Sequence, residues 1–230
     1  FCNTTSGVSI LKYSGNGTSS QSIGHGLGTK PQVVIVKCRT GGAESWIWWQ
    51  DTTGNGTADQ RLLLSGTQAN YGNNLATFQN TTFTTPSTND TAWNGGSGTY
   101  VAYAFTEKKG FSKFGSYKGR GSQSANNKYP FTYCGFKPAF VLVKNTQQAA
   151  DNWFIWDNKR PGYNQTQKYL SSNNNNVEAD SSSYAIDFLS NGFTIRSTTG
   201  AINNNNEDII YMAFAENPIV GSNNIPATAR

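Results

Sequence analysis

The 230-residue sequence is poor in charge and nearly devoid of histidine. Only 13% of the residues are charged, and His25 is the single histidine. Ordinary soluble domains carry about a quarter charged residues, so the polar surface must here be built from Asn, Ser, Thr, Gln and Gly. Such surfaces are typical of extracellular or virion proteins, and a lone histidine excludes a multi-histidine metal centre.

The sequence also lacks charge clusters, long apolar runs and paired cysteines. The net charge is +5 and no basic cluster is longer than Lys108-Lys109, which argues against nucleic acid as a partner. No stretch approaches the roughly 20 apolar residues of a membrane span, so we expect no membrane insertion. Cys2, Cys38 and Cys134 are odd in number and lack CxxC spacing, which favours free, half-buried thiols over a disulfide or a metal site.

Strand signals dominate what is present, and helical periodicity is nearly absent. Runs of four to eight β-branched and aromatic residues are bounded by Gly, Asn and Pro, which is typical of short antiparallel strands. Asn191-Gly192 lies between two such runs and predicts a tight hairpin. The predicted strands cover residues 8–13, 32–38, 45–50, 61–64, 81–84, 99–106, 111–117, 131–134, 139–144, 152–156, 184–189, 193–196 and 208–215.

The longest sequence phrase occurs twice. Residues 30–37 (KPQVVIVK), followed by 46–49 (WIWW), return as 137–144 (KPAFVLVK), followed by 153–156 (WFIW), at a constant offset of 107 residues. A unit of about 100 residues can bury its own core, unlike the shorter units of solenoids. The sequence therefore predicts an all-β protein with two tandem antiparallel β-sandwich, jelly-roll-like domains, residues 1–109 and 110–230, the second with a C-terminal tail. Residues 1–7 are expected to be a connector from an upstream module.

Two candidate sites for ions or catalysis have simpler interpretations. Asp51, Asn55 and Asp59 place oxygens as in the first half of a calcium loop, but Leu62 occupies the position of the expected bidentate acid, so an Asn-Gly hairpin is the preferred interpretation. His25 lies between glycines without a nucleophile motif, which indicates a turn residue rather than part of a Ser-His-Asp triad.

Three carboxylates could in principle serve glycoside hydrolysis. They are Asp157, Glu178 and Asp187, and a pair of them would need a separation that the sequence cannot specify. Gln50 stands opposite Asp157 in the repeat, so an active first copy is not expected. Solvent-facing or turn-capping acids are the preferred interpretation.

Candidate ligand contacts are residues that only one copy of the repeat has. Trp48 has no Trp counterpart in the second copy, which makes it the best candidate for an exposed stacking residue, with core filling as the alternative. The Asn runs 173–176 and 203–206 are expected at loop tips. From these runs we select Asn174, Asn175, Asn204 and Asn205 as candidate contacts.

Several long phrases resemble a family of repeat modules in virion proteins of marine tailed phages. They are residues 25–31 (HGLGTKP), 135–144 (GFKPAFVLVK), 153–157 (WFIWD), 186–193 (IDFLSNGF) and 210–218 (IYMAFAENP). The resemblance implies a virion appendage such as a tail fibre, and it supplies no catalytic residue. Residues 221–230 resemble the natural C-terminus of that family, so we expect the distal end of a longer polypeptide. Such appendages are usually trimeric, although the sequence contains no heptad or collagen-like stalk.

These observations together predict the C-terminal part of a phage tail fibre or related virion appendage. We expect a structural role and binding of a host-surface glycan or protein, without catalysis and without a cofactor. The expected partners are copies of the same chain, as a homotrimer, other virion proteins and the host receptor. The alternatives are a polysaccharide-degrading enzyme, which needs close carboxylates, and a cellular surface adhesin or lectin, which needs calcium or sugar sites at loop tips.

Overall fold

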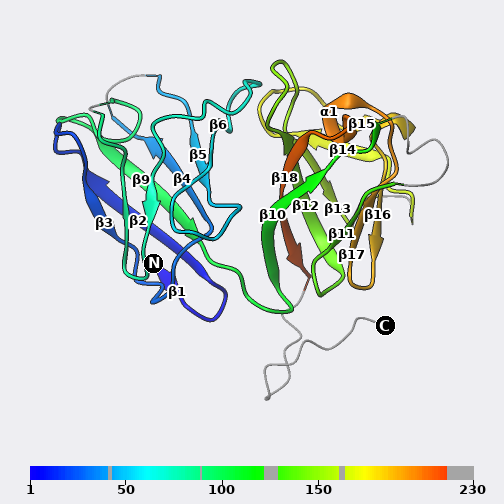
Figure 1. Cartoon of the computed structure of the whole chain (residues 1–230), viewed down its shortest axis with the longest axis horizontal. Helices are drawn as coiled ribbons and strands as arrows, with labels where there is room; N and C mark the ends of the chain where they lie inside the picture. The colour runs from blue at the N-terminus through cyan, green and yellow to red at the C-terminus, as the bar shows by residue number, and fades with distance from the viewer. Residues whose placement is uncertain (41–42, 89, 122–128, 161–163, 217–230) are drawn as a thin grey trace. The chain divides into compact units, whose positions relative to one another are not determined.

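The computed structural model describes residues 1–40, 43–88, 90–121, 129–160 and 164–216, and Figure 1 traces the chain. The chain divides into two compact units, Phe1–Glu107 and Lys108–Arg230, so the boundary falls two residues before the expected one. Both units consist of antiparallel sheets, and the one α-helix of the described residues is the four-residue α1 (Gly200–Asn203). The prediction of an all-β protein is confirmed.

The first unit contains a six-stranded and a three-stranded sheet. The large sheet has, in spatial order, β1 (Cys2–Asn3), β2 (Val8–Ser14), β9 (Thr99–Phe105), β4 (Val33–Cys38), β5 (Ile47–Gln50) and β6 (Gln60–Leu63). The small sheet has the order β3 (Ser22–Gly24), β8 (Thr82–Thr84) and β7 (Thr77–Phe78).

An aromatic core joins the two sheets of the first unit. Tyr13 of β2 stacks on Tyr100 of β9 with ring centroids 4.9 Å apart, and it meets Phe83 of β8 edge-on at 6.1 Å. Trp49 of β5 packs edge-on against Trp93 at 5.6 Å. All five side chains are buried in one cluster, so the alternation of each strand directs its apolar side chains into the space between the sheets.

The second unit repeats this architecture. Its large sheet has the order β10 (Ser112–Lys118), β18 (Asp208–Ala215), β12 (Pro138–Asn145), β13 (Phe154–Asp157), β14 (Lys168–Ser171) and β15 (Ala179–Asp180). Its small sheet has the order β11 (Phe131–Tyr133), β17 (Gly192–Ile195) and β16 (Ile186–Leu189). Tyr117 of β10 meets Phe193 of β17 edge-on at 6.1 Å, as Tyr13 meets Phe83 in the first unit.

The predicted strands all correspond to observed strands within a few residues, and the predicted hairpin at Asn191-Gly192 joins β16 to β17 with Leu189 opposite Gly192. Within the described residues, five short strands were not predicted, and one of them lies in the segment expected to be a connector. Residues 1–7 contain β1, which pairs with β2, and the Phe1 carbonyl accepts a hydrogen bond from the Ile10 N–H at 2.8 Å. Two residues of this segment therefore form an edge strand of the first sheet, paired with the edge of β2.

The three cysteines are free thiols, as the sequence predicts. Cys38 and Cys134 are buried and Cys2 is exposed. No helix in the described part of the chain is long and apolar enough to cross a membrane.

Candidate functional site

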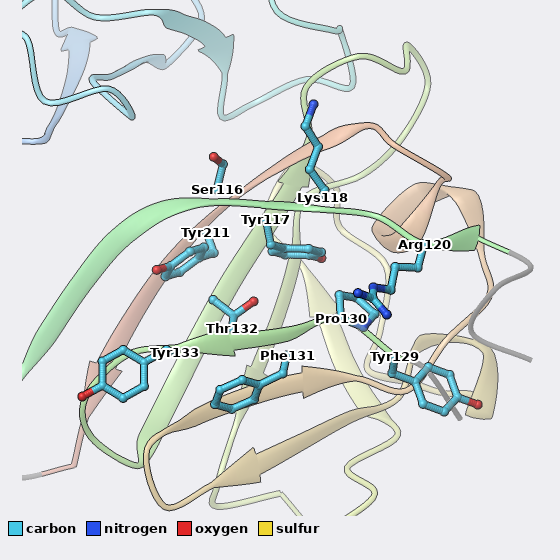
Figure 2. Close-up of a pocket in the computed structure, with 10 residues that line it drawn as sticks. All are labelled: Ser116, Tyr117, Lys118, Arg120, Tyr129, Pro130, Phe131, Thr132, Tyr133 and Tyr211. Carbon is cyan, nitrogen blue, oxygen red and sulfur yellow. The ribbon is translucent and has the colours of Figure 1, made fainter. Parts of the chain in front are cut away.

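A groove of about 530 Å³ lies in the second unit, where the edge of one sheet faces the edge of the other. β10 is the outermost strand of the large sheet, and β11 is the outermost strand of the small sheet. Figure 2 shows β10 along one side of the groove and β11 along the other. Its lining residues are Ser116, Tyr117, Lys118, Arg120, Tyr129, Pro130, Phe131, Thr132, Tyr133 and Tyr211.

The floor of the groove is made by residues that point between the sheets. Tyr117 and Tyr211 are 8% and 4% exposed, and the Tyr117 hydroxyl donates to the Ile202 carbonyl at 2.7 Å. Burial raises the pKa of Tyr117 well above its ordinary value, so this phenol stays neutral and fixed. These two rings form a rigid base for whatever occupies the groove.

Thr132 is the unusual residue of the floor. It is 6% exposed and points inward from β11, and its hydroxyl has no hydrogen-bond partner among the described residues. A buried hydroxyl without a partner costs about 1–3 kcal/mol. An apolar residue at this position would avoid that cost, so the hydroxyl is a polar feature that packing does not explain.

The rim on the β11 side is aromatic and open to solvent. Phe131 is 49% exposed and Tyr133 is 64% exposed, and strand alternation directs both away from the core on either side of Thr132. Exposed apolar side chains that lie next to one another form a patch of the kind found at interaction sites. They provide flat apolar faces, and Tyr133 adds a hydroxyl at its tip.

The far end of the groove is cationic. Figure 2 shows Tyr133 at one end and Arg120 with Tyr129 at the other, and the guanidinium of Arg120 is turned toward Pro130. Lys118 projects away from β11 and forms an ion pair with Asp208 at 2.9 Å. None of the described lining residues is acidic, so the groove has one aromatic end and one positive end.

The first unit keeps the scaffold of this region but not its side chains. The Tyr117–Phe193 contact has its counterpart in Tyr13–Phe83, and β11 has its counterpart in β3. Because Thr132 pairs with Phe193 and Ile23 pairs with Phe83, Ile23 is the residue equivalent to Thr132. The flanking residues of the first unit are then Ser22 and Gly24, in place of two exposed aromatic rings.

The backbone at the cationic end is also shared. The Arg120 N–H donates to Asn203 Oδ1 at 2.7 Å, and the Asn16 N–H donates to Asn94 Oδ1 at 3.0 Å. The Asn16 side chain of the first unit accepts from the Asn94 amide at 2.9 Å. The second unit therefore places a long cation on the same backbone support, in the lining of the groove.

The expectation that Trp48 is an exposed contact residue is wrong. Trp48 is 1% exposed, and its indole N–H donates to Gln50 Oε1 at 3.2 Å. In the sheet it lies between Ile35 of β4 and Leu62 of β6, both buried. Trp48 and Trp49 lie on opposite faces of β5, and both are buried. Both faces of this strand are therefore covered.

The calcium candidate is also wrong, because its oxygens are already used within the loop. Both carboxylate oxygens of Asp51 accept backbone N–H groups, from Gly54 at 2.6 Å and from Gly56 at 2.7 Å. Asn55 accepts from its own turn, and Asp59 accepts the Thr52 N–H at 2.8 Å. Within the described residues no cluster of three or more His, Cys, Asp or Glu could hold a metal ion. The loop joins the antiparallel strands β5 and β6, in line with the hairpin interpretation, and Asx-type hydrogen bonds hold it.

The remaining titratable candidates have structural partners. Arg160 forms ion pairs with both Asp157, at 2.9 Å, and Glu178, and Asp187 pairs with Arg196 at 3.3 Å. Burial raises the pKa of Asp187, and the Arg196 cation opposes this shift.

His25 is 2% exposed, and its Nδ1 accepts the Leu27 N–H at 3.1 Å. Nε2 lies 3.0 Å from the Gln79 carbonyl and therefore carries the proton. Both ring nitrogens hold the turn together, as the sequence interpretation predicts.

The two Asn runs differ in their positions. Asn174 and Asn175 are exposed on the loop between β14 and β15, as expected. The other run is not simply a loop tip, because Asn203 is the buried last residue of α1 and Asn204 donates its backbone N–H to the Gly200 carbonyl at 3.1 Å. Asn205 is exposed next to Gly121, beside the cationic end of the groove.

Residues 1–218 match the family model of a domain of unknown function, DUF7483. The chain belongs to this family. The match extends across both units, so the DUF7483 domain comprises the pair of sandwiches rather than one of them. The comparisons with curated proteins and with solved structures found no match.

Proposed function

We propose that this DUF7483 chain is a structural and adhesive module of a phage virion appendage, and that the second unit binds a glycan of the host surface. The observation that carries the proposal is the groove between β10 and β11. It combines exposed aromatic rings, a rigid floor and an exposed arginine. Saccharide rings present apolar C–H faces and polar edges, and such a groove offers both kinds of contact.

The difference between the two units supports this proposal. A groove that served only folding would be expected in both units, because the scaffold is shared. The aromatic rings Phe131 and Tyr133 instead replace Ser22 and Gly24 of the first unit. The sequence resemblance to virion modules and the low-charge polar composition favour display on a particle surface.

A polysaccharide-degrading enzyme is less well supported. Hydrolysis needs two carboxyl groups on either side of the scissile bond. Asp157 and Glu178 share one arginine, Asp187 has its own arginine, and none of the three lines the groove. We therefore expect binding without cleavage.

The test is binding of the labelled chain to envelope preparations from a panel of marine bacteria. Saturable binding is expected for the wild type, with a strong loss in the double variant Phe131→Ser/Tyr133→Ser. Val177→Ser, which removes an 87% exposed apolar side chain from the β14–β15 loop, is the matched control and should bind normally. Binding to no preparation, or equal binding by all three proteins, contradicts the proposal. Release of oligosaccharide from bound polysaccharide contradicts its non-enzymatic part.

A further inference from the structure

The groove is asymmetric along its length, and this asymmetry bears on which glycan fits. Tyr133 lies at one end, and Arg120 lies at the other. An arginine forms strong, often bidentate, hydrogen bonds with carboxylates, and none of the described lining residues is acidic. A neutral sugar makes no comparable use of the cationic end.

We propose that the groove selects acidic saccharides, with a sugar ring stacked on the rim formed by Phe131 and Tyr133 and the carboxylate of a neighbouring sugar at Arg120. This inference rests on the proposed glycan binding and specifies its substrate class. The floor between these two ends is formed by the buried rings of Tyr117 and Tyr211.

The counterpart residues in the first unit support the assignment of the charge. Asn16 replaces Arg120 on the same backbone hydrogen bond, and its side chain is held by the Asn94 amide. The shared fold therefore does not require an arginine at this position. Lys118 contributes less, because it points away from β11 and is paired with Asp208.

The experiment uses pairs of ligands that differ only in charge. Oligosaccharides from several polyuronates of different linkage are titrated into the full chain by calorimetry, each beside the same oligosaccharide with its carboxyl groups reduced to alcohols. A charge-assisted hydrogen bond is worth about 1.5–3 kcal/mol, so carboxyl reduction is expected to weaken binding about 10–100-fold. Arg120→Gln should weaken binding of the acidic form about tenfold or more and leave the reduced form unchanged.

Two variants separate this inference from the proposal beneath it. Tyr133→Ala should weaken both forms, because stacking does not depend on charge. Lys12→Gln, which removes the same charge from an exposed position in the first unit, should change neither. Equal binding of acidic and reduced forms, both weakened by Tyr133→Ala, overturns the acidic preference but keeps glycan binding. If neither form binds, both the acidic preference and glycan binding are overturned. Both are also overturned if protease treatment of the envelopes abolishes binding and no saccharide inhibits it, because the groove would then bind a protein receptor.

Discussion

A single methyl group at Gly119 is expected to destabilise the second unit strongly. An added Cβ would lie 1.9 Å from the Asn204 carbonyl oxygen, well inside any real contact, so β10 and the turn after α1 must separate. This contact is surrounded by hydrogen bonds that depend on it. The Gly119 N–H donates to the Glu207 carbonyl and the Gly119 carbonyl accepts from the Asn206 N–H, both at 2.9 Å.

The magnitude follows from these contacts. Overpacking of this kind costs about 1–3 kcal/mol, and each of the two weakened hydrogen bonds adds about 0.5 kcal/mol. We expect Gly119→Ala to lower the free energy of unfolding by about 2–4 kcal/mol, which for a unit of this size lowers its melting temperature by roughly 6–20 °C. The assay is thermal and urea denaturation of the full chain, followed by near-UV circular dichroism.

Two further substitutions make this result interpretable. Gly200→Ala is the matched control, because its added Cβ would meet only Asn204 Cγ at 3.7 Å and its backbone is helical; it should be neutral or slightly stabilising. Gly15→Ala should destabilise the first unit as Gly119→Ala destabilises the second, because its Cβ would lie 2.2 Å from the Gly95 carbonyl oxygen. A melting temperature of Gly119→Ala equal to that of the wild type would refute the close approach of Gly119 to the Asn204 carbonyl. It would also refute the shared architecture of the two units at this position.

Two other predictions concern ionisable groups. Asp51→Ala removes the acceptor of two backbone N–H groups and should cost about 2–4 kcal/mol in urea denaturation, while added calcium should not raise the melting temperature of the wild type. Burial alone would raise the pKa of Glu207, but hydrogen bonds from Asn145, Gln148 and Asn204 outweigh it and lower that pKa below 4.5. Glu207 therefore stabilises the fold above pH 4.5, and this contribution is lost as the pH falls through the lowered pKa. Glu207→Gln should show a smaller loss of stability than the wild type between about pH 6 and pH 3; an unchanged acid sensitivity contradicts the assignment.

The fold could be predicted largely because its long strands follow simple patterns. The segments that became β4 and β12 contain continuous apolar runs. Those that became β9 and β18 are long, with seven and eight residues. β3 was missed because its three residues Ser22, Ile23 and Gly24 contain one apolar side chain and show no periodicity. Helix α1 was missed because four residues are too short for a helical pattern to appear.

The site was predicted less well, for a physical reason. The groove combines residues of β10 and β11, edge strands of different sheets, and no sequence spacing shows that two edges face each other. Trp48 was chosen because it has no counterpart, but its neighbours across the sheet bury it. Phe131 and Tyr133 also have no aromatic counterpart in the first unit. They could have been selected as contacts if β3 had been recognised, because their equivalents Ser22 and Gly24 lie in that strand. Asn204 and Asn205 are the predicted contacts that lie beside the groove, next to Gly119 and Gly121 on either side of Arg120.

The most direct test of glycan binding in the second unit is an NMR titration of the isotope-labelled chain with oligosaccharides from a bound host polysaccharide. The account predicts that saturable amide shifts concentrate in residues 116–120 and 129–133. The equivalent residues 22–24 of the first unit should be unaffected. Shifts confined to the Asn-rich loop 173–176, or spread equally over both units, would contradict the account.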